Sequence, residues 1–152
     1  LMQGFGMTAD LEFMPWTAVR HARDALEVVN RAGRPSNAGI LVDALHVARS
    51  DTTLADLAAL PRDLLHYAQI CDAPLANAQG STTLSVDDMI HTARCERLLP
   101  GEGEIDLRSL FDALPADLPI SVEVPHHVRA RAVGDLAWSG QALAATRALL
   151  DI

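Results

Sequence analysis

Four short apolar runs alternate with longer amphipathic segments along this chain, and this alternation limits the folds open to it. The runs lie at about residues 9–14, 39–43, 65–70 and 120–124. In the segment after the first run, Val19, Ala22, Leu26 and Val29 recur every three or four residues, which is typical of a helix with one apolar face. Repeated strand-then-helix units predict a parallel sheet. The expected fold class is therefore α/β, with about four βα units.

The same patterning predicts where the helices lie. Helices are expected at residues 17–32, 53–60, 86–93, 106–114 and 135–150. Thr53 and Asp56 have the spacing of a capping box at the start of the second helix. The polar stretch at residues 72–84, which contains Gly, Ser and Thr, predicts a loop longer than the neighbouring ones.

Composition narrows the classes of protein and partner. With 49% hydrophobic and 21% charged residues, residues 1–152 are expected to form one globular domain. The net charge of −8, without a block of Lys or Arg, argues against a nucleic-acid partner and favours a small molecule. Cys71 and Cys95 have neither the spacing of a disulfide framework nor that of a metal site. No apolar run approaches the roughly 18 residues of a membrane span, and no signal-peptide pattern precedes the first strand. The expectation is a soluble cytoplasmic protein without a membrane partner.

Acidic or amide side chains stand at or near the carboxyl end of each apolar run: Glu12, Asp43, Gln69 and Glu123. In parallel α/β folds, these strand ends converge on the face where ligands bind. Three carboxylates and one amide oxygen there would suit Mg²⁺ or Mn²⁺ better than a thiolate-bound zinc ion. The alternative interpretation is that each acid only marks the end of a strand. Repetition in four successive units favours a shared site.

Five stretches together resemble a known family. They are Leu11–Trp16 (LEFMPW), Gly39–His46 (GILVDALH), Gln69–Pro74 (QICDAP), Arg97–Leu107 (RLLPGEGEIDL) and Ser121–Val124 (SVEV). In this order they resemble the last four strands of the sugar phosphate isomerase/epimerase family, within the xylose isomerase-like TIM barrels. The most specific pieces are the Asp43-x-x-His46 pair and the Pro-Gly-Glu-Gly turn. The resemblance implies that residues 1–152 form the C-terminal half of a (β/α)8 barrel.

The resemblance also implies a site and an activity. Glu12, Asp43, Gln69 and Glu123 would bind Mn²⁺ or Mg²⁺, with Co²⁺ and Zn²⁺ as alternatives, and His46 and Arg97 would hold substrate oxygens. Glu12 and Glu123 would be the catalytic acid and base on opposite sides of the ion. The implied function is a metal-dependent sugar or sugar phosphate isomerase or epimerase that transfers a proton through an enediolate. Its substrate would be a carbohydrate or a hydroxy acid.

Three alternatives stay open. Many epimerases of the family have His where this chain has Gln69, and Gln there resembles bacterial 3-dehydroshikimate dehydratases, so a lyase is the second hypothesis. The third is a non-catalytic half-barrel, because a complete barrel needs about 250 residues. A DNA-repair endonuclease on the same barrel is disfavoured by the acidic charge. Four units leave two open sheet edges, which predicts a homo-oligomer or association with an N-terminal half.

Overall fold

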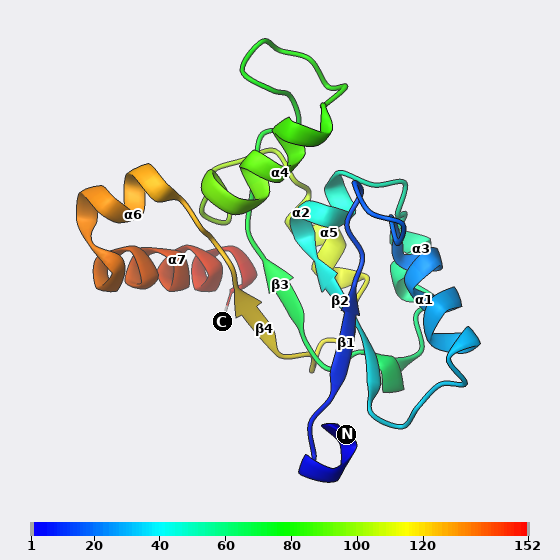
Figure 1. The fold of residues 1–152 in the computed structure, drawn as a ribbon. Coiled ribbons are helices and arrows are strands. Elements are labelled where there is room, and N and C mark those ends of the chain that lie inside the picture. Colours follow the sequence, from blue (N-terminus) through cyan, green and yellow to red (C-terminus); the bar gives the residue numbers. More distant parts are fainter. Residues whose placement is uncertain (1, 152) are drawn as a thin grey trace.

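A parallel sheet whose strand order follows the chain forms the centre of the fold (Figure 1). The computed structural model describes residues 2–151. Within them the strands are β1 (Ala9–Glu12), β2 (Ala38–Asp43), β3 (Ala68–Ile70) and β4 (Ile120–Val122), in the order β1-β2-β3-β4. All neighbouring strands pair in parallel. The predicted α/β class is confirmed, and the arrangement is that of a partial barrel.

Helices connect these strands. Unit one contains α1 (Ala22–Arg31), and unit two contains α2 (Ala44–Ala48), α3 (Leu54–Ala58) and the 3-10 turn η2 (Arg62–Leu64). After β3 come α4 (Val86–Cys95) and α5 (Leu107–Asp112), and after β4 come α6 (His127–Val133) and α7 (Asp135–Leu150). A further 3-10 turn, η1 (Met2–Phe5), precedes β1. The long connection expected after β3 is present, since the 72–85 loop and α4 project together from the top of the sheet in Figure 1.

Three local predictions differ from the structure. The helix expected from residue 17 begins at Ala22, because the Thr17 hydroxyl donates to the carbonyls of Met14 and Val19 and so forms a turn. His21 caps α1 instead, where its Nδ1 accepts from Asp24 N. Short helices α2 and α6 form where loops were expected. The capping box at Thr53 and Asp56 is confirmed.

The two faces of the sheet differ in chemistry. Ile40, Val42 and Ile70 are fully buried in one apolar cluster that also includes side chains from α1, α3 and α5. Because side chains alternate along a strand, the positions between them face the other way. These are mainly polar: Asp10, Glu12, Gly39, Leu41, Asp43, Gln69 and Ser121. The helices therefore cover one face and leave the other for a site.

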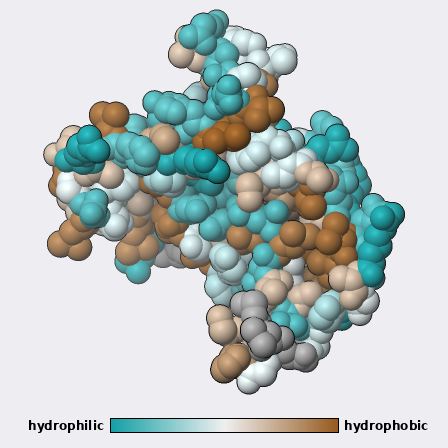
Figure 2. Space-filling model, viewed as in Figure 1, coloured by the Kyte–Doolittle hydropathy of each residue, from teal (hydrophilic) through white to brown (hydrophobic). Residues whose placement is uncertain are grey.

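The rim of the fold carries exposed apolar residues. Neither β1 nor β4 pairs with a further strand on its outer edge among residues 2–151. Figure 2 shows hydrophobic residues at the surface of the α6–α7 hairpin, and Val128 and Leu136 there are 71% and 90% exposed. No helix within the described part of the chain is long and apolar enough to cross a membrane.

Candidate metal centre

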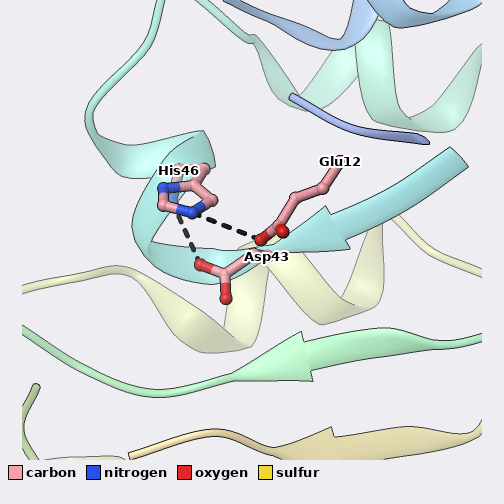
Figure 3. Close-up of side chains that lie close together, drawn as sticks. All are labelled: Glu12, Asp43 and His46. Carbon is pink, nitrogen blue, oxygen red and sulfur yellow. Dashed lines mark hydrogen bonds and ion pairs between the residues drawn. The ribbon is translucent and has the colours of Figure 1, made fainter. Parts of the chain in front are cut away.

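Glu12, Asp43 and His46 come together at the carboxyl ends of β1 and β2 (Figure 3). One ligand atom from each lies within 4.8 Å of the others. His46 Nε2 is 3.3 Å from Glu12 Oε1. Asp43 and His46 are buried, and Glu12 is partly exposed. Two carboxylates and an imidazole form a donor set that suits a divalent cation.

The position of His46 follows from the way β2 ends. Asp43 is the last residue of β2 and also the N-cap of α2. Its Oδ1 accepts from Leu45 N at 2.8 Å and from His46 N at 3.2 Å. A side chain that satisfies the first free N–H groups of a helix fixes its start. The Asp43-x-x-His46 spacing therefore brings the imidazole back to the carboxylate within a single helical turn.

Arg97 links the second carboxylate oxygen of Asp43 to the fourth strand. Its NH1 donates to Asp43 Oδ2 at 2.5 Å and lies 2.9 Å from Glu123 Oε2. The contact with Glu123 is an ion pair without hydrogen-bond geometry, so that Oε2 has no hydrogen-bond partner among the described residues. Arg97, expected to hold substrate oxygens, thus faces two of the predicted metal ligands.

Burial raises the pKa of Glu123, and the nearby carboxylates of Asp43 and Glu12 add to this shift while Arg97 opposes it. Glu123 therefore lies within electrostatic range of the acids on β1 and β2. A raised pKa suits a carboxyl group that exchanges protons near neutral pH. The four predicted ligands are not all in contact, but the carboxylates of Glu12 and Asp43 both influence the pKa of Glu123.

Gln69 and His46 each carry a buried polar atom without a partner. Gln69 Oε1 and His46 Nδ1 make no hydrogen bond within residues 2–151. An unsatisfied buried polar atom costs about 1–3 kcal/mol, so such atoms usually have a ligand, a water molecule or an ion to contact. The free amide oxygen on β3, beside Asp43 in the strand register, fits a cation ligand. Ligation by the four residues remains a prediction.

Residues 97–105 form a strap beside the end of β3, where Leu98 exchanges backbone hydrogen bonds with Asp72. Fully buried Asp72 holds it, since Oδ1 accepts from Ala73 N and Ile105 N, and Oδ2 accepts from Gly101 N at 2.9 Å. A Cβ on Gly103 would lie 2.3 Å from Asp72 Oδ1 and 2.6 Å from the backbone of Ala73. The Pro-Gly-Glu-Gly motif thus permits a close approach to Asp72.

Asp72 is a functional residue that the pattern of strand-end acids does not include. Its signal in the sequence is a charged residue between two small ones, Cys71 and Ala73, which predicts burial with backbone partners. Trp16 lies in the loop that follows β1. Its ring packs edge-on against the His46 imidazole, with centroids 5.0 Å apart. No sequence signal predicts this contact, because it depends on how the loop after β1 folds over α2.

A parallel βα array with a polar cluster at the carboxyl ends of its strands is the active-site arrangement of α/β barrels. Comparison with known proteins gives the family. The chain belongs to the xylose isomerase-like TIM barrel family, whose model matches residues 2–149. One of the proteins to which the chain is similar is an enzyme.

The chain is similar to 3-dehydroshikimate dehydratase of Pseudomonas aeruginosa PAO1, with 28% identity over 123 residues, which is 78% of this chain and 18% of that protein. The structure of IolI with a bound zinc atom is similar over 97% of this chain and 50% of that one, with 21% identity and a TM-score of 0.78. A xylose isomerase domain protein from Alicyclobacillus acidocaldarius is 27% identical, with coverage of 95% and 54% and a TM-score of 0.58. The chain spans about half the length of these two solved structures.

Proposed function

We propose that this chain supplies the C-terminal half of a divalent-metal enzyme that removes a proton next to a carbonyl group. The observation that carries the proposal is the cluster of Glu12, Asp43 and His46, with the free oxygen of Gln69 on the next strand. In this proposal Glu12, Asp43, Gln69 and Glu123 hold the ion, and Mn²⁺ or Mg²⁺ suits their oxygen donors. Bound there, the ion would stabilise negative charge that develops on the substrate oxygen.

Glu12 and Glu123 are the proposed proton-transfer groups. They stand at the ends of β1 and β4, the two edge strands of the described sheet, and therefore approach a substrate from opposite sides. The raised pKa of Glu123, caused mainly by burial, favours a group that holds a proton and returns it. Glu12 would accept the first proton. His46, beside Glu12, would orient that carboxylate or a substrate oxygen.

Gln69 and the dehydratase relative favour elimination over isomerisation. In this outcome the proton is lost from the carbon next to the carbonyl, and the β-hydroxyl leaves as water after it receives a proton. We propose a 3-dehydroshikimate dehydratase-like reaction on a cyclic hydroxy acid. The support is the Gln at the third ligand position, together with 28% identity to the named dehydratase.

An isomerase or epimerase is the second candidate. The specific observation for it is the pair of acids on opposite edge strands, because epimerisation needs one group to remove a proton and another to return it. The substrate would be a sugar or sugar phosphate. Conversion in D₂O separates the two reactions, since an isomerase introduces deuterium at the reacting carbon of its product.

The metal content of the intact protein is the first test. About one divalent ion per chain is expected, and Glu12→Gln is expected to lose it, while Glu27→Gln, an exposed acid on α1, keeps it. Incubation with 3-dehydroshikimate should then yield an aromatic acid detected by its ultraviolet absorbance. Absence of the ion from folded protein would reject the metal centre, and metal without the aromatic product would reject the dehydratase.

We also propose that four further βα units close this half into a barrel. The open outer edges of β1 and β4 and the exposed Leu136 on α7 support this. The partner is either an N-terminal half or a second copy of the chain. Sedimentation of the 16.3 kDa chain alone as a compact monomer would contradict this proposal.

A further inference from the structure

The guanidinium of Arg97 is buried among the acids of the candidate centre. Its side chain is 4% exposed, while that of Glu123 is 42% exposed. Besides Asp43 and Glu123, NH1 contacts the Cys71 sulfur at 3.4 Å. A guanidinium buried to this extent exposes little surface to a substrate. Because burial of a charge is costly, it also needs negative charge nearby.

The protein fixes this guanidinium without help from a ligand. Arg97 Nε donates to Ala93 O at 2.9 Å, in the last turn of α4. Its backbone N donates to Pro125 O at 3.0 Å, and the next residue, Leu98, exchanges backbone hydrogen bonds with Asp72. The side chain is thus anchored at both ends, and its charge stands permanently beside Asp43.

The electrostatic effects on Arg97 agree with this geometry. Burial by itself lowers the pKa of Arg97, but the groups around the guanidinium, with Asp43 first among them, together offset burial, and the net shift is upward. An arginine guanidinium is charged in proteins at any physiological pH, so its position alone places a permanent positive charge beside Asp43 and Glu123.

We propose that Arg97 is the permanent counter-ion of the carboxylate cluster formed by Glu12, Asp43 and Glu123. The guanidinium holds Asp43 and Glu123 together in the absence of a metal, and it reduces the net negative charge of the site that binds the metal. This rests on the proposed function. Glu12, Asp43 and Glu123 carry three negative charges when ionised, and the guanidinium reduces them to two. One divalent ion then neutralises the site. Arg97 is a positioning residue in this account and does not touch the substrate.

The test compares the thermal stability of the intact protein in a chelator and in saturating Mn²⁺. Without metal, Arg97→Met should lower the Tm by roughly 10 °C, because it leaves the buried carboxylate of Asp43 without a cation. Added Mn²⁺ should raise the Tm of this variant by more than it raises that of the wild type. Its Mn²⁺ dissociation constant should fall about tenfold, since a nearby positive charge is gone.

Arg49→Met is the matched control. Arg49 is also partly buried, but it donates to the carbonyl oxygens of Pro74 and Leu75 and not to an acid. Its loss should lower the Tm, yet leave the Mn²⁺-induced shift at the wild-type value. Should Arg97→Met fail to fold, the double variant Arg97→Met/Glu123→Gln is expected to recover part of the stability, because one of the two acids left without a cation is then uncharged.

The outcomes separate this proposal from the proposed function. A Tm unchanged by Arg97→Met in the chelator, or equal Mn²⁺-induced shifts in both proteins, would overturn the counter-ion while the metal centre stands. The opposite result is also possible: the Tm of the wild type does not respond to Mn²⁺, Arg97→Met is destabilised, and Glu123→Gln reduces that destabilisation. This result would support the role of Arg97 as counter-ion and reject the proposed metal function.

Discussion

Nδ1 of His66 lies 2.5 Å from Oδ1 of Asp10, at the amino-terminal end of the sheet and opposite the candidate metal centre. The second carboxylate oxygen of Asp10 accepts from the Thr8 hydroxyl at 2.9 Å. Gly39 on β2 lies next to Asp10 in the strand register. A Cβ there would stand 1.8 Å from Asp10 Oδ1 and 2.5 Å from His66 Nδ1. The pair therefore depends on the missing side chain of Gly39.

Gly39→Ala should lower the free energy of unfolding by about 2 kcal/mol, because the added methyl group forces the Asp10–His66 pair apart. Urea denaturation of the intact protein measures this. Gly140→Ala is the control, since a Cβ at Gly140, inside α7, meets no described atom within 4 Å. It should raise stability by about 0.5–1 kcal/mol, as expected for a helical glycine. Equal effects at both positions would contradict the account.

Asp72→Asn should cost about 3 kcal/mol of stability. The amide keeps one acceptor oxygen but turns an NH₂ group toward N–H donors that a carboxylate now satisfies, in a fully buried position. Urea denaturation tests it, with Asp112→Asn as the control. Asp112 is exposed at the end of α5, and its substitution should change stability by less than about 0.5 kcal/mol. If Asp72→Asn lowers the free energy of unfolding by less than about 1 kcal/mol, contacts other than those of Asp72 hold the strap in place.

The capping box of α3 should make stability depend on acid pH. Hydrogen bonds from Thr53, and then Arg23, lower the pKa of Asp56 from 3.8 to about 2. A folded-state pKa below the unfolded value gives stabilisation that is complete above about pH 5 and is lost as the pH falls toward 2. The stability difference between wild type and Asp56→Asn should therefore narrow between about pH 5 and pH 2. Thermal unfolding followed by circular dichroism measures this difference. A difference that stays constant with pH would refute a role of the Asp56 charge in capping α3.

The two cysteines should differ sharply toward a thiol reagent at pH 8. The Cys71 thiol is fully buried and its pKa is raised to about 12, chiefly by burial, so almost no thiolate forms. Cys95, at the end of α4, is partly exposed. One fast-reacting thiol per native chain is expected, and Cys95→Ser should remove it. Two thiols that react at equal rates before unfolding would contradict the burial of Cys71.

Local signals predicted the strands and most helices. The apolar runs at residues 39–43 and 120–124 fall on β2 and β4, and Thr53 and Asp56 begin α3 as their spacing indicates. Helix α2 escaped prediction because Asp43 serves both as the end of a strand and as the helix cap, so no separate capping residue marks its start. The position of α6 was also missed, since His126 is an uncommon N-cap.

The candidate site was only partly predictable. Glu12 and Asp43 stand where strand ends converge, and the sequence indicates that convergence. The placement of Arg97 is different, because its own hydrogen bond to Pro125 and those between Leu98 and Asp72 decide it, and these partners are distant in sequence. No local pattern encodes such contacts. The resemblance assigned Arg97 to the substrate, while the geometry directs its charge to Asp43 and Glu123.

The strand order, identical to the order along the chain, has a consequence for protein synthesis. Each βα unit leaves the ribosome with its own polar side chain, so the centre is assembled from the amino-terminal side onward. Asp43 emerges 54 residues before Arg97, an interval of roughly 3–10 s at typical translation rates. During that time β2 has an acid at its end without its cation. Stable burial of Asp43 must therefore await the third unit, which couples folding of the first two strands to completion of the strap.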